Sequence, residues 1–135
     1  MLRRVLSCRR GAVAVEGAII LPILVLLVVG VMEYGILLFT FMTLQSATRE
    51  VARAASVNFT AVADVPADLR ARLPSWSRSS AAITVAQSAA GSATTNVITI
   101  TATIPSSAAT PIHLLTAVGG WDLKTVVKMK QEQPL

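Results

Sequence analysis

The side chains that most often carry chemistry are scarce in this sequence, which has one histidine and one cysteine in 135 residues. His113 lies among apolar residues with no cysteine or carboxylate cluster nearby, which is typical of a partly buried histidine rather than of a ligand or base. Cys8 has no partner for an internal disulfide. The GxSxG, HExxH, GxxxxGK and CxxC motifs do not occur. We therefore predict a protein that is not an enzyme and has no metal site or cofactor.

Gly11 stands at a position that favours processing by another protein. The basic leader before it contains four arginines, namely Arg3, Arg4, Arg9 and Arg10, and a long apolar run follows it. A secretory signal has its small-residue cleavage site after the apolar segment, whereas here the small residue precedes it. Cleavage between Gly11 and Ala12 would keep the apolar run on the mature chain and make Glu16 its fifth residue.

The apolar run has the length and composition of a membrane span. Hydrophobic residues make up 53% of the chain, and the mean hydropathy of +0.64 is too high for an ordinary soluble domain. No charged residue occurs from Gly17 to Met32, and the next charge after Glu33 is Arg49. From Gly17 to Met42 there are 26 residues, about 39 Å as a helix, which is longer than the roughly 30 Å of a bilayer core. The lipid bilayer is therefore an expected partner.

The net charge of +5 is explained by membrane topology rather than by nucleic-acid binding. The leader arginines form a positive cluster just before the span, and such clusters stay on the cytoplasmic side. Removing these four from the twelve basic residues leaves eight against seven acidic residues, a net charge of +1. We predict a single-pass protein of the inner (cytoplasmic) membrane, with its N-terminus inside, its C-terminus outside and no nucleic acid partner.

Three residues in or beside the span have alternative interpretations. Pro22 either kinks the helix near its start or is tolerated because neighbouring helices satisfy the freed carbonyl. Glu33 either bonds within a helix bundle or marks the outer edge of the membrane, with Tyr34 as an interfacial anchor. Counting from Ala12 leaves about 21 residues before Glu33, roughly one bilayer, which favours the membrane edge.

Beyond the span the sequence predicts a continued helix and then a small β-rich region. Apolar residues recur at spacings of three and four from Leu44 to Ala55, which indicates an amphipathic helix to about Ser56. Segments 82–87 and 97–104 predict a hairpin, and alternation near the C-terminus predicts a third strand. The apolar connection 111–120 is expected to form a short helix. The predicted fold class is α+β, a long N-terminal transmembrane and amphipathic helix followed by an antiparallel sheet of about three strands.

The residues from the leader junction to the end of this helix form one pattern. It consists of Gly11 and Glu16 at the processing site, Pro22, the run Glu33-Tyr34-Gly35, and the series Gln45, Ala47, Arg49-Glu50 and Ala52-Arg53. This segment resembles TadE-like proteins, minor pilins of the tight-adherence (Flp) type IV pilus. Two positions depart from the family pattern, since Gly17 stands where an aromatic or large residue is usual and Leu37 where a basic residue is common.

The resemblance implies a structural role in pilus assembly, priming or tip and base contacts for adhesion. A prepilin peptidase would cut between Gly11 and Ala12, and the new α-amine would pair with Glu16 of a neighbouring subunit. Without the resemblance, Glu16 is more simply a charge at the headgroup boundary. The implied partners are the prepilin peptidase, other pilin and minor-pilin subunits and the inner-membrane assembly machinery. Extraction into an extracellular pilus is one implied fate.

The predicted organisation has three parts: a prepilin leader at 1–11, a transmembrane and pilin-type helix at 12–57, and a small β-rich extracytoplasmic region at 58–135. The alternative is an uncleaved, signal-anchored single-pass adaptor or scaffold of an envelope secretion complex. The N-terminal residue of the mature protein distinguishes the two hypotheses, because only a processed pilin begins at Ala12.

Overall fold

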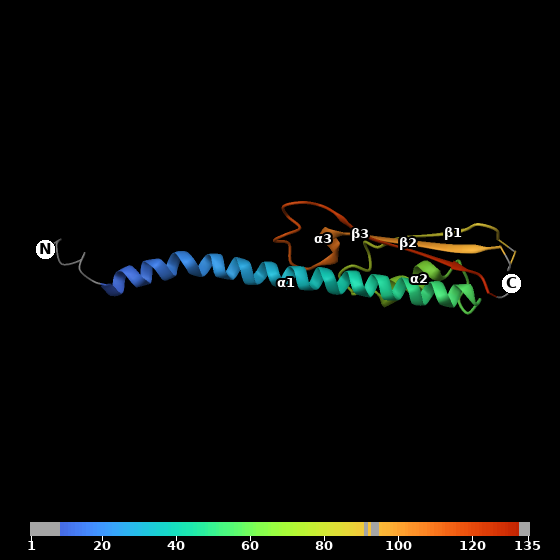
Figure 1. The fold of residues 1–135 in the computed structure, drawn as a ribbon, viewed down its shortest axis with the longest axis horizontal. Coiled ribbons are helices and arrows are strands. Elements are labelled where there is room, and N and C mark those ends of the chain that lie inside the picture. Colours follow the sequence, from blue (N-terminus) through green and yellow to red (C-terminus); the bar gives the residue numbers. More distant parts are fainter. Residues whose placement is uncertain (1–8, 91, 93–94, 133–135) are drawn as a thin grey trace. The chain divides into compact units, whose positions relative to one another are not determined.

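The computed structural model describes residues 9–90, 92 and 95–132, so the predicted leader lies outside the described residues as far as residue 8. In chain order the elements are α1 (Arg9–Ser56), α2 (Val65–Arg72), β1 (Ala82–Gln87), β2 (Val97–Pro105), α3 (Ser106–Ala109) and β3 (Asp122–Lys130) (Figure 1). A long N-terminal helix is thus followed by a three-stranded antiparallel sheet. The predicted α+β fold class is confirmed.

α1 is a single helix of 48 residues that belongs to two different compact units. The division between the units falls between Met32 and Glu33. None of the side chains described up to Met32 is buried. From Glu33 onward α1 has one buried face, which belongs to the second unit. The apolar and the amphipathic segments expected from the sequence are therefore parts of the same helix.

The sheet of the second unit has the strand order β1-β2-β3, with both neighbouring pairs antiparallel. β2 lies in the centre, where Ile100 is opposite Val85 of β1 and Val127 of β3. Successive β2 residues alternate between buried and half-buried, because side chains of a strand point to opposite faces of the sheet. The isoleucines on the buried face are Ile98, Ile100 and Ile104, as the alternation in the sequence predicts.

One apolar core joins this face of the sheet to α1 and α2. The residues from α1 recur at spacings of three and four, which places them on one stripe of the helix. They are Leu37, Leu44, Ala47, Val51, Ala52 and Ala55, and α2 adds Val65 and Leu69. Because many of these side chains are small, the helix and the sheet bury only a modest apolar surface. Hydrogen bonds between them therefore contribute a larger share of the stability of this unit.

Two elements differ from the expectations. α2 is not among the predicted elements, although Pro66 in its first turn with Asp68, and Arg70 and Arg72 in its last turn, are favourable helix-end residues. The short helix expected at 111–120 does not form. A four-residue helix, α3, precedes that segment instead, and the backbone amides in the middle of the segment bond to a side chain of α1.

Candidate functional site

The predicted processing residues lie near the start of α1. The helix begins at Arg9, so Gly11, Ala12 and Glu16 are all helical, although the side chain of Ala12 lies outside the described part. Gly11 and Glu16 are exposed. A Cβ added at Gly11 meets no described atom within 4 Å, and glycine inside a helix is unfavourable by about 1 kcal/mol relative to alanine. The fold therefore gives no reason for a glycine at this position.

From Gly17 to Met32, α1 is apolar on all sides. Up to Met32, the exposed large hydrophobic side chains of this helix have exposed fractions from 48% to 68%. A helix that is hydrophobic all round belongs either in lipid or inside a large protein core, and none of its most apolar 18-residue window is buried. This helix is long and apolar enough to cross a membrane. It has the features of a membrane anchor, and Pro22 lies within it.

Glu33 is the first residue of the second unit and is fully buried there. Its Oε2 accepts hydrogen bonds from the backbone N–H groups of Leu114 and Leu115, at 2.7 and 2.6 Å. Its Oε1 accepts one from the N–H of Thr116 at 3.1 Å. Three consecutive amides thus converge on one carboxylate, an arrangement that stabilises an anion through oriented dipoles. We call this set of contacts the Glu33 clamp.

The Glu33 clamp replaces the helix expected at 111–120, because the amides of 114–116 are directed at one shared acceptor. The role of Glu33 at the membrane edge stays a prediction, and neither interpretation of this residue includes a bond to the loop. The partners lie 81 to 83 residues away in sequence. The only signal in the sequence is a carboxylate that ends an apolar run and has no basic residue near it before Arg49.

A second polar tie lies further along the same face of α1. The buried Oγ1 of Thr40 donates a hydrogen bond to the carbonyl oxygen of Ala109 at 2.8 Å. The indole Nε1 of Trp76 donates to the same oxygen at 3.2 Å. Leu37, which lies between Glu33 and Thr40 in sequence, is in the apolar core. The carbonyl at the end of α3 is therefore satisfied from two sides, and this fixes α3 against α1.

A third set of ties holds the C-terminal end of β3 against the end of α1. The N–H of Glu132 donates to the carbonyl oxygen of Ser56 at 3.0 Å. The side chain of Gln131 accepts from Asn96 Nδ2 at 2.8 Å and donates to Asn58 Oδ1 at 3.0 Å. Asn58 has a φ of 57°, in the left-handed region that asparagine tolerates better than most residues. These contacts fix the second unit at the end opposite to the Glu33 clamp along α1.

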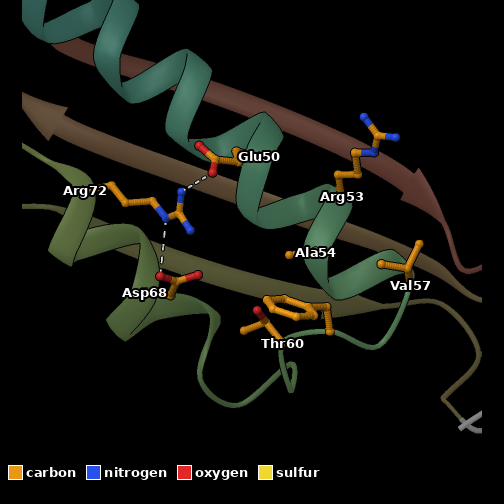
Figure 2. Close-up of a pocket in the computed structure, with 8 residues that line it drawn as sticks. Glu50, Arg53, Ala54, Val57, Thr60, Asp68 and Arg72 are labelled. Carbon is orange, nitrogen blue, oxygen red and sulfur yellow. Dashed lines mark hydrogen bonds and ion pairs between the residues drawn. The ribbon is translucent and has the colours of Figure 1, made fainter.

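A pocket lies between the last turns of α1 and α2 (Figure 2). Arg72 of α2 points toward Glu50 of α1, with which it forms an ion pair, and its Nε lies 3.3 Å from Oδ1 of Asp68. Hydrogen bonds to Glu50, and then to Asp68, raise the pKa of Arg72 above its usual value. Both carboxylates of the pocket are thus engaged with Arg72, and the pair with Glu50 links α2 to α1, which is a structural role.

The chemistry of the described residues offers no further centre. Within the described ranges, no group of three or more His, Cys, Asp and Glu side chains could hold a metal ion. His113 Nδ1 lies 3.4 Å from Thr116 Oγ1, which places the histidine beside the Glu33 clamp and not beside a nucleophile. The arrangement as a whole is suited to anchoring and assembly.

Comparison with known protein families singles out the N-terminal helix. Residues 11–53 match the family model described as TadE-like protein. These 43 residues, about a third of the chain, are similar to TadE-like proteins. The match begins at Gly11 and includes Glu16, Pro22, Glu33 and Tyr34. No curated protein and no solved structure matches the chain.

This segment is similar to TadE-like proteins, a family associated with the tight-adherence pilus, and it contains most of the helix that is long and apolar enough to cross a membrane. The family is a structural one, and it is not known to be enzymatic. The segment contains the apolar part of α1 and most of its amphipathic part, and it stops before the sheet. The recognised pattern is therefore the anchor and the helix on which the β-rich unit folds.

Proposed function

We propose that this protein is a minor pilin or pseudopilin of a tight-adherence pilus. It is inserted with its N-terminus in the cytoplasm and is trimmed between Gly11 and Ala12 by a prepilin peptidase. The observation that carries the proposal is the TadE-like match, which begins at Gly11 and continues along one unbroken helix. Trimming at that point would leave the anchor on the mature chain.

The role of the mature protein is structural. Its apolar helix holds it in the inner membrane and packs with other pilin and minor-pilin subunits, while the β-rich unit makes contacts outside the cytoplasm. The inner-membrane assembly machinery is the further partner. The exposed apolar surface of α1 up to Met32 supports this role, since it is free to contact lipid or the helices of other subunits.

Glu16 links trimming to assembly in this proposal. A carboxylate beside an apolar span is unfavourable in lipid unless it finds a partner. Trimming creates an α-amine at Ala12, which pairs with Glu16 of an adjacent subunit. The exposure of Glu16 in the single chain leaves it accessible to such a neighbour.

Replacement of Gly11 by leucine tests the processing step. A bulky residue before the cut should leave an uncut precursor, which an intact-mass spectrum of protein from the native membrane would detect. Gly35→Leu is the matched control, because Gly35 lies in the same helix and a Cβ there also meets no described atom within 4 Å. If the native protein retains Met1 while the peptidase is active, the pilin proposal is wrong and an uncleaved adaptor takes its place.

A further inference from the structure

An exposed apolar patch lies beside the Glu33 clamp in the second unit. Its residues are Tyr34, Leu115, Val118 and Trp121, which line a shallow hollow together with Leu37 and Gly119. Tyr34 is 57% exposed, Trp121 47% and Val118 89%. We call these four exposed residues the Trp121 patch. Apolar side chains gathered in this way mark a contact site rather than ordinary surface.

The Glu33 clamp fixes the position of this patch along α1. Glu33 directly follows Met32, the last residue of the apolar unit. Its carboxylate holds the amides of 114–116, and the chain then turns, with the N–H of Val118 donating to the carbonyl of Leu115 at 3.2 Å. The Trp121 patch is therefore held at the residues where the apolar surface of the helix ends.

The distribution of charge indicates which partner covers the patch. No charged residue occurs between Arg78 and Asp122, so the loop and the strands before it carry none. The opposite end of the unit is different, because exposed Phe59 lies in a pocket with Glu50, Arg53 and Arg72. An uncharged patch with a tryptophan and a tyrosine is the composition of a membrane interface.

We propose that the Trp121 patch rests in the headgroup region of the outer leaflet, so that the β-rich unit lies against the membrane surface before assembly. The proposal depends on the anchoring of α1 described above, because the 16 uncharged residues from Gly17 to Met32 span about 24 Å, most of a hydrocarbon core of about 30 Å. Glu33 then leaves the core where it ends, and Tyr34 and Trp121 enter the interface together. Asp122, which follows Trp121, is exposed.

The intrinsic fluorescence of the two tryptophans of the chain provides the test. The Trp76→Phe variant of the full chain, in which Trp121 is the only tryptophan, is reconstituted in vesicles of phosphatidylethanolamine and phosphatidylglycerol. A phospholipid brominated near the headgroup end of its acyl chains is the quencher. The emission of Trp121 should be blue-shifted, and the brominated lipid should quench most of it. Trp76 in the Trp121→Phe variant should be quenched much less.

Two further substitutions in the Trp76→Phe chain separate insertion from general membrane proximity. Val118→Asp places a charge at the tip of the loop and should restore most of the Trp121 emission, since a carboxylate resists transfer toward lipid. Phe59→Asp is the matched control, because Phe59 is 86% exposed at the charged end of the unit. It should leave the quenching unchanged.

The outcomes distinguish this inference from the anchoring on which it rests. Flotation of the vesicles reports anchoring independently of fluorescence. If the protein floats but Trp121 is not quenched, the inference is wrong and the anchor stands. A blue shift that depends on the protein-to-lipid ratio without quenching shows that a second subunit covers the patch, which also overturns it. Failure to float overturns both.

Discussion

Glu33 shows how a single carboxylate can be accommodated where an apolar helix meets a folded unit. A carboxylate only accepts hydrogen bonds, and its two oxygens have room for the three amides that point at it. No basic side chain is needed, because the oriented N–H dipoles of the loop stabilise the charge. The same bonds give the loop a defined conformation that its own sequence does not impose.

We predict that Glu33→Gln loosens the loop without unfolding the sheet. Glutamine has one acceptor oxygen, and its NH₂ group would face backbone N–H donors, so at least one charge-assisted bond is lost. The amides of 114–116 should exchange with deuterium faster by about tenfold or more, the factor that corresponds to one such bond. Hydrogen exchange followed by mass spectrometry, on the protein in detergent micelles, measures this change.

Glu50→Gln is the control for that experiment. Glu50 lies on the same helix but is exposed, and it pairs with Arg72 at the surface, where ion pairs contribute little. Its replacement should leave exchange at 114–116 unchanged. Equal exchange in the Glu33→Gln variant and the parent would show that the carboxylate does not hold the loop.

We predict that Glu16→Gln is processed normally but assembles poorly. Glutamine keeps the volume of the side chain and removes the charge that pairs with the neighbouring α-amine, leaving that amine unpaired. Loss of one partner of a buried pair reduces assembly by roughly a hundredfold or more. A gel shift measures processing, and crosslinked subunits or sheared pili measure assembly. The control is Glu132→Gln, because Glu132 is exposed and lies at the far end of the second unit. If Glu16→Gln assembles normally, the pairing is wrong and Glu16 is only a charge at the membrane boundary.

At the scale of elements, one helix, α1, contributes residues to both units. From Gly17 to Met32 its surface is apolar on every side, which suits lipid or other apolar helices. After Met32 one face packs on the sheet, and the polar ties at Glu33, Thr40 and Ser56 fix its register there. The amphipathic half of the helix is therefore a structural part of the β-rich unit.

We predict that Leu44→Ala destabilises the β-rich unit strongly. Leu44 is fully buried in the core between α1 and the sheet, and truncation of such a leucine leaves a cavity that lowers the free energy of unfolding by about 3 kcal/mol. Met42→Ala should change it by less than about 0.5 kcal/mol, because Met42 is exposed on the other side of α1. Denaturant unfolding in micelles, followed by circular dichroism of the sheet, compares the two. Similar midpoints would mean that the helix does not pack on the sheet.

At the scale of the whole molecule, the leader and the anchor together determine orientation. The four leader arginines precede the span, and the next basic residue is Arg49. The positive-inside rule therefore predicts that the β-rich unit lies outside the cytoplasm. An orientation with the C-terminus outside is also the one that a pilus subunit requires.

We predict that alkaline phosphatase fused after Leu135 is active, because this enzyme folds only outside the cytoplasm. A fluorescent reporter that works only in the cytoplasm, fused at the same position, should give no signal and is the control. The opposite pattern of the two reporters would reverse the orientation and place the β-rich unit inside the cell.

The sequence by itself determined the elements whose patterns are local. A run of apolar residues without charge defined the anchor, and spacings of three and four defined the continuation of α1 to Ser56. Alternation of isoleucine and threonine defined β2 and its buried face. The same local patterns were enough to recognise the TadE-like segment, because that pattern lies entirely within one helix.

Only the tertiary structure decided how these elements are tied together. Glu33 meets the amides of 114–116 across more than 80 residues of sequence, and Thr40 meets Ala109 across 69. Backbone amides carry no sequence signature, so their partners can be found only once the chain has folded. The same holds for the Trp121 patch, since Tyr34 and Trp121 line the same hollow although they are 87 residues apart in sequence. The physical reason is that hydrogen bonding and packing depend on distances in space, whereas periodicity depends only on neighbours in the chain.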